Sequence, residues 1–312
     1  MALRHEPAPP RMSLTLAAPF HAASRSARSA RRPRVTPYLL LAPSLICLAL
    51  FTYWPLIQVL LRSFWSGARP GIGNYARLLA DAHFTTAVVN NVLYALGTIL
   101  PALALALAFA LALQRSTRLV LVLRTLFVMP LMIPLVAAAA LFSFVLLPGE
   151  GLLDTYLAPL GLGAANWLGD PSLALPSIIG ITIWKNTGYY MLFFLAGLAA
   201  VPAELLEAAR IDGAGACARF RHVTLPMLGP TFGFVLPIAA VNALVQVDHV
   251  VTLTQGGPSD STNLLLYYIY QQAEQNHDAG LAAAATALSV AALLSLAMLS
   301  LRATDRGLHH AS

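Results

Sequence analysis

Residues 82–114 read AHFTTAVVNNVLYALGTILPALALALAFALALQ, a run of 33 residues without Asp, Glu, Lys or Arg. An α-helix of about 20 apolar residues crosses the hydrocarbon core of a bilayer, which is about 30 Å thick. This run is therefore long enough and apolar enough to span a membrane. In the whole chain of 312 residues, 58% are hydrophobic and 10% are charged. Soluble globular proteins carry about 25% charged residues, so the composition excludes an ordinary cytosolic enzyme and a disordered or fibrous chain.

The gaps between charged residues elsewhere in the chain have similar lengths. Five further gaps are 35–61, 125–149, 171–203, 222–247 and 279–301. The gap 171–203 has a single interruption, Lys185. Each gap is long enough for one membrane crossing. The sequence therefore predicts an all-α membrane protein with six transmembrane helices. The alternative, a soluble protein with buried helices, is disfavoured because six such runs leave too little polar surface.

The arginines predict the orientation. Fifteen of them lie in the N-terminal tail, the second and fourth loops and the C-terminal tail, which a six-span topology places on one side. The other side has only Arg62, Arg69 and Arg77. Positive charge is retained on the cytoplasmic side, so both termini are expected there. The net charge of +6 is thus explained by topology and calls for no nucleic-acid partner.

Three regions are expected along the chain. Residues 1–36 are rich in Arg, Ser, Ala and Pro, which predicts a disordered basic tail in the cytoplasm. Residues 37–302 form the six-span domain, and residues 303–312 form a short cytoplasmic tail. A cleaved signal peptide is disfavoured because the first apolar run, 38–61, is longer than the roughly 7–15 residues of a signal core.

Lys185 is the only lysine of the chain and lies in the middle of the predicted fourth span. A charge at the bilayer centre costs about 2.5–3.5 kcal/mol, so something must offset it. Two hypotheses stay open: a structural pair, with Asp248 at the outer end of the fifth span as the candidate partner, and a place on the substrate path. Asn186, Tyr189 and Tyr190 extend this polar stretch. Asn186, Tyr189 and Asp248 are candidates for the same path as Lys185.

Prolines inside the predicted spans indicate kinked helices, because proline interrupts the hydrogen-bond ladder. Such helices suit a transporter but are also common in other membrane proteins. The prolines concerned are Pro55, Pro101, Pro130, Pro134, Pro176, Pro230 and Pro237.

Motifs for catalysis and for metal binding are absent from the sequence. It contains no Gly-x-x-x-x-Gly-Lys-Ser/Thr loop for phosphates, no His-Glu-x-x-His and no Gly-x-Ser-x-Gly. The two cysteines, Cys47 and Cys217, are expected in the membrane and in the cytoplasm, so they form no structural disulfide. No catalytic residue and no metal ligand is therefore predicted.

The predicted fourth loop, residues 201–226, reads VPAELLEAARIDGAGACARFRHVTLP. Pro202 suits a first helical position, and acidic residues follow it near the helix N-terminus. Ala208 and Ala209 keep one helix face shallow, and Gly213 permits a tight turn. A second short helix is expected to end before Leu225. The segment indicates a docking element on the inner surface, with a solvated connector as the alternative.

Within this segment the spacing resembles the EAA signature of ABC importer permeases. Glu207-Ala208-Ala209 is followed after three residues by Gly213, and then by Val223, where the family usually has Ile, and Leu225-Pro226. Asp212-Gly213-Ala214 resembles the carbohydrate-uptake subfamily. Further similarities extend the resemblance from about residue 38 to 301, most like the first permease of sugar and glycerol-3-phosphate importers. They are Tyr38 to Pro43, Gly73-Asn74-Tyr75, Leu253 to Pro258 and Tyr268-Ile269-Tyr270, with a departure at Glu274, where Phe is frequent.

The resemblance implies a complex in the bacterial plasma (inner) membrane. A second permease, in a heterodimer, completes the translocation path for a sugar or sugar-like solute, with glycerol-3-phosphate among the candidates. An extracytoplasmic solute-binding protein delivers the solute, and an ATPase dimer binds ATP and Mg. Residues 201–226, hereafter the EAA segment, would couple to the ATPase through Glu207, Ala208, Ala209, Asp212, Gly213, Leu225 and Pro226. The binding protein would dock on Gly256, Gly257, Pro258 and Asp260.

Two other function classes compete with this interpretation. A stand-alone secondary transporter or channel would require coupling charges within the membrane, usually in repeated halves, and would leave the EAA segment without a role. A membrane-bound enzyme is disfavoured by the missing catalytic motifs.

Overall fold

The computed structural model describes residues 35–66, 69–115, 117–161 and 165–308. The chain divides into two units, residues 1–52 and 53–312, each considered by itself. The described part of the first unit is a helix, α1 (Val35–Leu48), which continues into a π-helical turn, η1 (Ala49–Tyr53). The predicted tail, residues 1–36, lies outside the described residues except for its last two positions, which are already helical.

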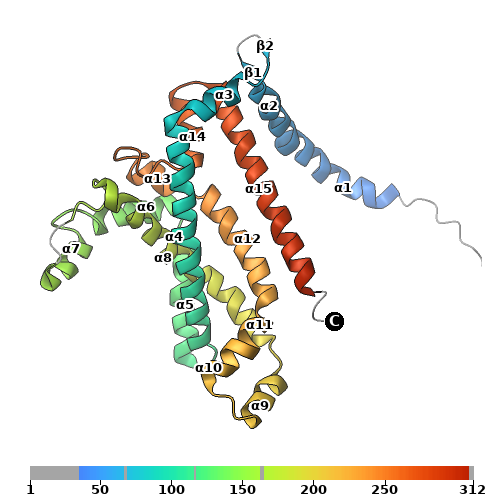
Figure 1. The fold of residues 1–312 in the computed structure, drawn as a ribbon, viewed down its shortest axis with the longest axis vertical. Helices are drawn as coiled ribbons and strands as arrows, with labels where there is room; N and C mark the ends of the chain where they lie inside the picture. Colours follow the sequence, from blue (N-terminus) through green and yellow to red (C-terminus); the bar gives the residue numbers. More distant parts are fainter. Residues whose placement is uncertain (1–34, 67–68, 116, 162–164, 309–312) are drawn as a thin grey trace, which may run out of the picture. The chain divides into compact units, whose positions relative to one another are not determined.

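The second unit begins at Tyr53, the last residue of η1, and contains α2 and all later elements (Figure 1). Its first part has a two-residue hairpin between two helices, in which Trp65 pairs with Pro70. The elements are α2 (Trp54–Ser63), β1 (Trp65–Ser66), β2 (Arg69–Pro70), α3 (Gly73–Ala80) and the long α4 (Ala82–Ala112). They are followed by α5 (Arg118–Met132), α6 (Leu135–Val145), α7 (Leu152–Leu157), the 3-10 turn η2 (Ala158–Leu160) and α8 (Pro171–Ala199).

The remaining elements run from the EAA segment to the last span. The EAA segment forms α9 (Ala203–Ile211), α10 (Ala216–Arg219), the π-helical turn η3 (Phe220–Thr224) and the start of α11 (Leu225–Met227). They lead into α12 (Gly229–Val245), α13 (Asp248–Leu253), α14 (Leu265–Tyr270), the π-helical turn η4 (Gln271–Gln275) and α15 (Ala279–Leu308).

Three long helices begin at side chains that cap the free backbone N–H groups of the first turn. Asp81 accepts from the N–H of His83 at 2.9 Å before α4, and Thr117 accepts from Val120 at 3.3 Å before α5. Asp170 accepts from Ser172 at 2.8 Å before α8, with Pro171 in the first turn. These short polar signals therefore fix where the apolar helices start.

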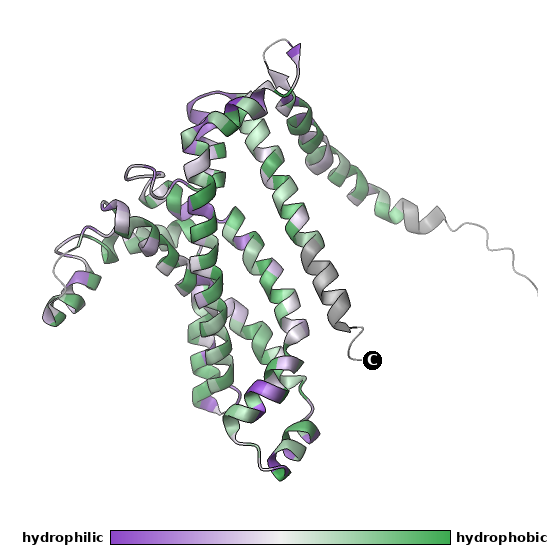
Figure 2. Cartoon of the chain, in the orientation of Figure 1, coloured by the Kyte–Doolittle hydropathy of each residue, from purple (hydrophilic) through white to green (hydrophobic). Residues whose placement is uncertain are grey.

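The membrane spans agree with the sequence prediction. Four helical segments, Leu40–Ser63, Ala82–Ala112, Gly229–Leu253 and Ala279–Met298, are each long and apolar enough to cross a membrane. Two bent pairs, α5 with α6 and α8 with α9, raise the number to as many as six among the described residues. Apolar residues predominate along α4, α12 and the coloured part of α15, and hydrophilic residues gather in the connections between helices (Figure 2).

The third predicted span differs from a single kinked helix. It breaks between Met132 and Leu135, and α6 turns by 101° from α5. Pro134 lies in this break, whereas Pro101, Pro176 and Pro237 remain inside continuous helices. Among the prolines predicted to kink a span, Pro134 therefore lies at a complete break between two helices.

The core of the second unit forms where α4 and α5 pack along α8. Small side chains of α4, including Ala102, Ala106 and Ala110, share one buried cluster with Tyr190 and Phe194 of α8. α15 packs against α2 and α12. Helices in membranes associate closely through small residues, which explains why alanine is frequent at these contacts.

The backbones of α8 and α5 lie close together at Gly188. A β-carbon there would lie 1.8 Å from the carbonyl oxygen of Phe127. Only glycine permits this backbone approach, so a substitution at Gly188 would force the two helices apart.

Candidate functional site

The EAA segment begins with a helix whose acidic and small residues are exposed. α9 starts at Ala203, with Pro202 as its N-cap rather than its first helical residue, one position later than predicted. Glu207 and Ala208 are exposed, and Ala209 is half-buried. The predicted shallow face is therefore available at the surface of this chain.

The turn after α9 is a Schellman motif, in which a left-handed glycine ends the helix. Gly213 has φ +78°, and its N–H donates to Arg210 O at 3.1 Å. The N–H of Ala214 donates to Ala209 O at 2.9 Å. The predicted tight turn at Gly213 is thus confirmed. Asp212 is the C-cap of the helix and is exposed.

The second helix of the EAA segment is longer than predicted. It was expected to end before Leu225, but α10 continues through η3 into α11 and ends at Met227. Pro226 is accommodated because it lies in the first turn of α11, directly after a π-helical turn, where its missing N–H breaks no α-helical hydrogen bond. Leu225 and Pro226 are both exposed.

The other side of the EAA segment lies near the ends of two long helices. A hollow of about 300 Å³ lies between them and the segment. Leu206 and Phe220 of the segment face Leu111 of α4 and Leu198 of α8 across it. The segment therefore has one side that lines this hollow and one exposed side, which carries Glu207 and Ile211, the latter 87% exposed.

Lys185 is buried in the middle of α8, and its ammonium group donates hydrogen bonds to backbone carbonyls. Its Nζ donates to Pro130 O at 3.3 Å and to Ile133 O at 2.5 Å, both at the end of α5. Among the described residues the salt bridges are Arg77–Asp278 and His83–Asp260, so Lys185 has no carboxylate partner there, Asp248 included. The predicted pairing with Asp248 is therefore not the one observed.

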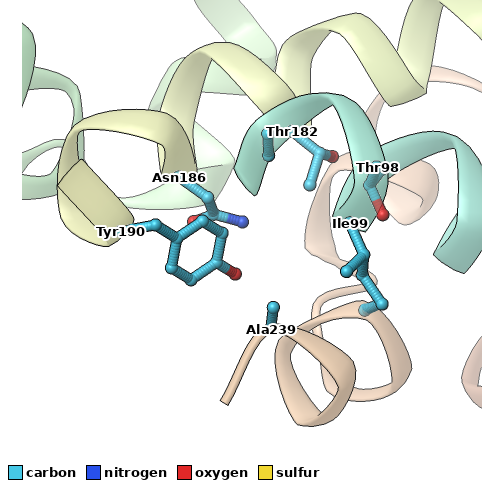
Figure 3. Close-up of a pocket in the computed structure, with 8 residues that line it drawn as sticks. Thr98, Ile99, Thr182, Asn186, Tyr190 and Ala239 are labelled. Carbon is cyan, nitrogen blue, oxygen red and sulfur yellow. The ribbon is translucent and has the colours of Figure 1, made fainter. Parts of the chain in front are cut away.

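Asn186 and Tyr190 connect α8 to α12. The Nδ2 atom of Asn186 donates to Gln246 Oε1 at 3.0 Å, and Asn242 Nδ2 donates to the Tyr190 hydroxyl at 3.2 Å. Asn186 and Tyr190 line a cavity of about 10 Å³ together with Thr98 of α4 (Figure 3). This is about the space that one water molecule needs.

A second group of buried polar side chains was missed by the sequence analysis. The Tyr94 hydroxyl lies 2.8 Å from Thr182 Oγ1 and 3.1 Å from His249 Nε2, and Thr182 Oγ1 lies 3.2 Å from that nitrogen. His249 is fully buried, and its Nδ1 has no hydrogen-bond partner among the residues that the structure describes. In the sequence, these three residues are recognisable only as polar side chains in largely apolar runs. Their spacing along the chain does not show that they meet.

The other two residues expected on the path lie apart from this group. Tyr189 is half-buried, and its ring contacts Tyr190 in a tilted arrangement and Phe193 edge-on. Asp248 is exposed at the start of α13. Of the four predicted path residues, the structure therefore brings Asn186 to the polar cavity and places Lys185 against α5.

The outer residues proposed for docking belong to a compact loop between α13 and α14. Gly256 is buried, with φ +78°, and a β-carbon on it would lie 2.5 Å from the Tyr267 ring. Gly257 and Pro258 are half-buried. Asp260 Oδ2 lies 2.6 Å from His83 Nδ1, and its backbone oxygen accepts from Asn90 Nδ2 at 2.7 Å. The loop is therefore held against the outer end of α4.

Another outer carboxylate organises the connection before α8. Asp154 accepts from the N–H of Gly149 at 2.7 Å and from Trp167 Nε1 at 2.7 Å. These two hydrogen bonds lower the pKa of Asp154 below its usual range. Within the described ranges, His, Cys, Asp and Glu side chains form no group of three that could hold a metal ion.

The sequence and fold were compared with known proteins. Residues 102–310 match the family model for the binding-protein-dependent transport system inner membrane component. The sn-glycerol-3-phosphate transport system permease protein UgpA of Agrobacterium fabrum is 31% identical over 89% of this chain and 97% of its own length. The probable ABC transporter permease protein YurN of Bacillus subtilis is 32% identical over 86% of this chain and 96% of its own.

Solved structures show the same fold. A chain of a bacterial ABC transporter involved in the import of the acidic polysaccharide alginate superposes with a TM-score of 0.79 at 24% identity, covering 87% of this chain and 95% of that one. A second alginate transporter structure, in complex with an alginate pentasaccharide-bound periplasmic protein, gives a TM-score of 0.77 at 23% identity. The family match and the full-length relatives favour the permease interpretation over a stand-alone transporter or channel. The chain belongs to the inner-membrane components of binding-protein-dependent transport systems and is a transmembrane permease subunit of an ABC importer.

Proposed function

We propose that this permease forms half of the translocation path for a sugar or sugar-like solute, with sn-glycerol-3-phosphate as one candidate. The names of the relatives support this class, since they include glycerol-3-phosphate permeases. A solute-binding protein delivers the solute, and a second, different permease completes the path. Comparing uptake of radiolabelled sn-glycerol-3-phosphate and of neutral sugars in cells with and without the complete complex tests this. Uptake of none of them would contradict the proposed class.

ATP and Mg belong to a separate ATPase dimer in this proposal, and the permease itself is not an enzyme. The sequence of this chain contains no phosphate-binding loop to hold a nucleotide. The EAA segment is the part of the chain that would transmit the closing of the ATPase to the spans.

The observation that carries this proposal is the two-sided placement of the EAA segment. On one side Leu206 and Phe220 line a hollow together with the ends of α4 and α8, and on the other side Glu207 and Ala208 are exposed. A hydrogen-bonded turn at Gly213 joins the two helices. A push on the exposed face would therefore be passed to helices that line the core of the permease.

The solute path is proposed to run beside the neutral polar groups of α8. Asn186 and Tyr190 line the small cavity with Thr98, and Tyr189 lies next to Tyr190. These groups offer hydrogen-bond donors and acceptors of the kind that sugar hydroxyls require. Conversion of Asn186 to Leu should reduce uptake without loss of the ATPase subunit, and unchanged uptake would remove Asn186 from the path.

The coupling role is tested by charge reversal on the exposed face of α9. We expect Glu207→Lys to leave the permease in the membrane but to lower both uptake and the amount of ATPase that co-purifies, by about tenfold if about 1.4 kcal/mol of binding is lost. Glu150→Lys is the matched control, because Glu150 is also exposed but lies in the connection before α7. Full uptake and full ATPase content in Glu207→Lys would overturn the coupling proposal.

A further inference from the structure

Two consecutive residues in the middle of α8 bind two different neighbouring spans. Lys185 donates to the carbonyl oxygens of Pro130 and Ile133 at the end of α5. Asn186 donates to the side chain of Gln246, which follows the last residue of α12. Each of these two neighbours is interrupted at the point where α8 binds it.

The first interruption is the break between α5 and α6. Pro134 has no N–H, so it cannot donate to the carbonyl of Pro130 as a continuing helix would. The Pro130 carbonyl instead accepts from the N–H of Ile133 at 3.3 Å, and the last carbonyls of a helix carry the negative end of its dipole. The ammonium group of Lys185, which is 6% exposed, supplies both donors and charge at this position. Within the part of the chain that the structure describes, no carboxylate takes the place of these carbonyls as its partner.

The second interruption is the break between α12 and α13. Gln246 leaves the helical conformation with ψ 100°, and α13 begins two residues later at Asp248. Asn186 holds the Gln246 side chain at 3.0 Å. One turn earlier on α8, Thr182 Oγ1 lies 3.2 Å from Nε2 of His249 in α13. α8 therefore contacts both sides of this break.

The segments beyond the two breaks, α6 and α13, pack against each other (Figure 1). Their positions relative to α8 depend on the two bends, and the residues that hold the bends are adjacent in sequence. A close backbone contact at Gly188, one turn from Lys185, keeps α8 and α5 in fixed register.

We propose that Lys185 and Asn186 form a clasp that sets the bends of two broken spans and so positions α6 and α13 together. In this role Lys185 is a positioning residue that caps α5 and does not bind the solute. Discontinuous helices are used by transporters to form moving parts near the bilayer midplane, and the clasp would hold such a part in one arrangement. The clasp does not depend on which solute is carried, so it can be tested without one.

The bend at Pro134 is measured by electron spin resonance distances in the purified complex. Cys47 and Cys217 are first replaced by Ser, and spin labels are placed at Val122 of α5 and Phe144 of α6, both exposed. Lys185→Met removes the charge and the donors. The distance between the labels should then lengthen and its distribution broaden, because the uncapped bend is free to open.

Two matched variants separate capping from other effects. Thr187→Val removes a hydroxyl from the same turn of α8. Among the described residues this hydroxyl bonds within α8, to Ile183 O at 2.6 Å, so the variant should leave the distance unchanged. Lys185→Arg keeps a cation with several donors and should stay near the wild-type distance. A second label pair, at Leu236 of α12 and Thr252 of α13, should respond in the same way to Asn186→Leu.

Each outcome decides the proposal. A lengthened distance in Lys185→Met with a normal one in Thr187→Val supports the clasp. An unchanged distance in Lys185→Met overturns it and returns Lys185 to the solute path. If Lys185→Met is not recovered from membranes, recovery of Lys185→Arg supports the clasp, and loss of both variants contradicts it.

Discussion

At the scale of single residues, the charged groups outside the spans act mainly as caps and partners. Asp81 caps α4 and also accepts from the Tyr268 hydroxyl at 2.6 Å. Burial and this carboxylate raise the pKa of Tyr268, so its hydroxyl stays protonated and donates. Asp278 caps α15 through the N–H of Leu281 at 2.9 Å and pairs with Arg77. The positions of Asp81 and Asp278 in the sequence place them outside the membrane spans but do not reveal that they cap helices and bind other side chains.

Asp278 gives a pH-dependent contribution to stability. Burial raises its pKa, but the N–H of Leu281 and the Arg77 guanidinium outweigh this effect, so its native pKa is lowered. Its contribution is therefore complete above the unfolded pKa of about 3.9 and is lost as the pH falls through the native pKa. Asp278→Asn should reduce the melting temperature at pH 7 only slightly, since partly exposed pairs contribute about 0–1 kcal/mol.

The measurement is thermal unfolding of the purified protein between pH 7 and about pH 3, a range set by the aspartate pKa. The difference between wild type and Asp278→Asn should shrink toward the acidic end. Glu274→Gln, which changes an exposed carboxyl in the same outer connection, is the control for net charge. A difference that grows as the pH falls would show that the sign is wrong.

At the scale of elements, helix breaks and turns decide which side chains meet. α4 and α8 stay continuous through Pro101 and Pro176, whereas Pro134 ends one helix and caps the next. A proline inside a helix leaves one carbonyl unpaired, and neighbouring groups decide whether the chain bends or breaks. Those neighbours, Lys185 among them, come from other spans, so the sequence of the third span does not identify the break.

The loop between α13 and α14 is the element proposed to receive the binding protein, through Gly256, Gly257, Pro258 and Asp260. Because Asp260 contacts His83 at 2.6 Å, a substitution there changes both the loop and its charge. We expect Asp260→Lys to weaken receptor-stimulated ATP hydrolysis by the complex more than basal hydrolysis. His83→Gln disturbs the same contact without reversing the charge and is the matched control.

Rates of ATP hydrolysis with and without the binding protein check this expectation. Equal loss of both rates in Asp260→Lys would indicate a folding defect in the loop. An equal decrease of stimulation in His83→Gln and Asp260→Lys would assign the effect to the loop conformation and would contradict a docking role for the charge.

At the scale of the whole molecule, the arginine bias predicts the orientation of all six spans. Reporter fusions after Arg118 and after Arg302 should both report a cytoplasmic location, because these positions lie in the arginine-rich segments. A fusion after Glu150 should report the opposite side. Alkaline phosphatase and green fluorescent protein fusions give complementary signals, and a periplasmic signal after Arg118 or Arg302 would overturn the topology.

The sequence alone was sufficient for the features that depend on local composition and spacing. Charge-free runs such as 82–114 predict the spans because a bilayer accepts only long apolar helices. The spacing from Glu207 to Pro226 indicates the family, and the turn at Gly213 follows from the conformational freedom of glycine. These properties are set by residues close together in the chain.

The tertiary structure alone decided what the polar groups inside the membrane do. From the sequence, Lys185 could pair with Asp248 or face the solute, but its nearest acceptors are carbonyls 52 and 55 residues earlier in the chain. Tyr94, Thr182 and His249 likewise meet only because three helices pack together. A buried polar group must find a partner in the low-dielectric core, and packing between distant helices determines which partner lies within reach.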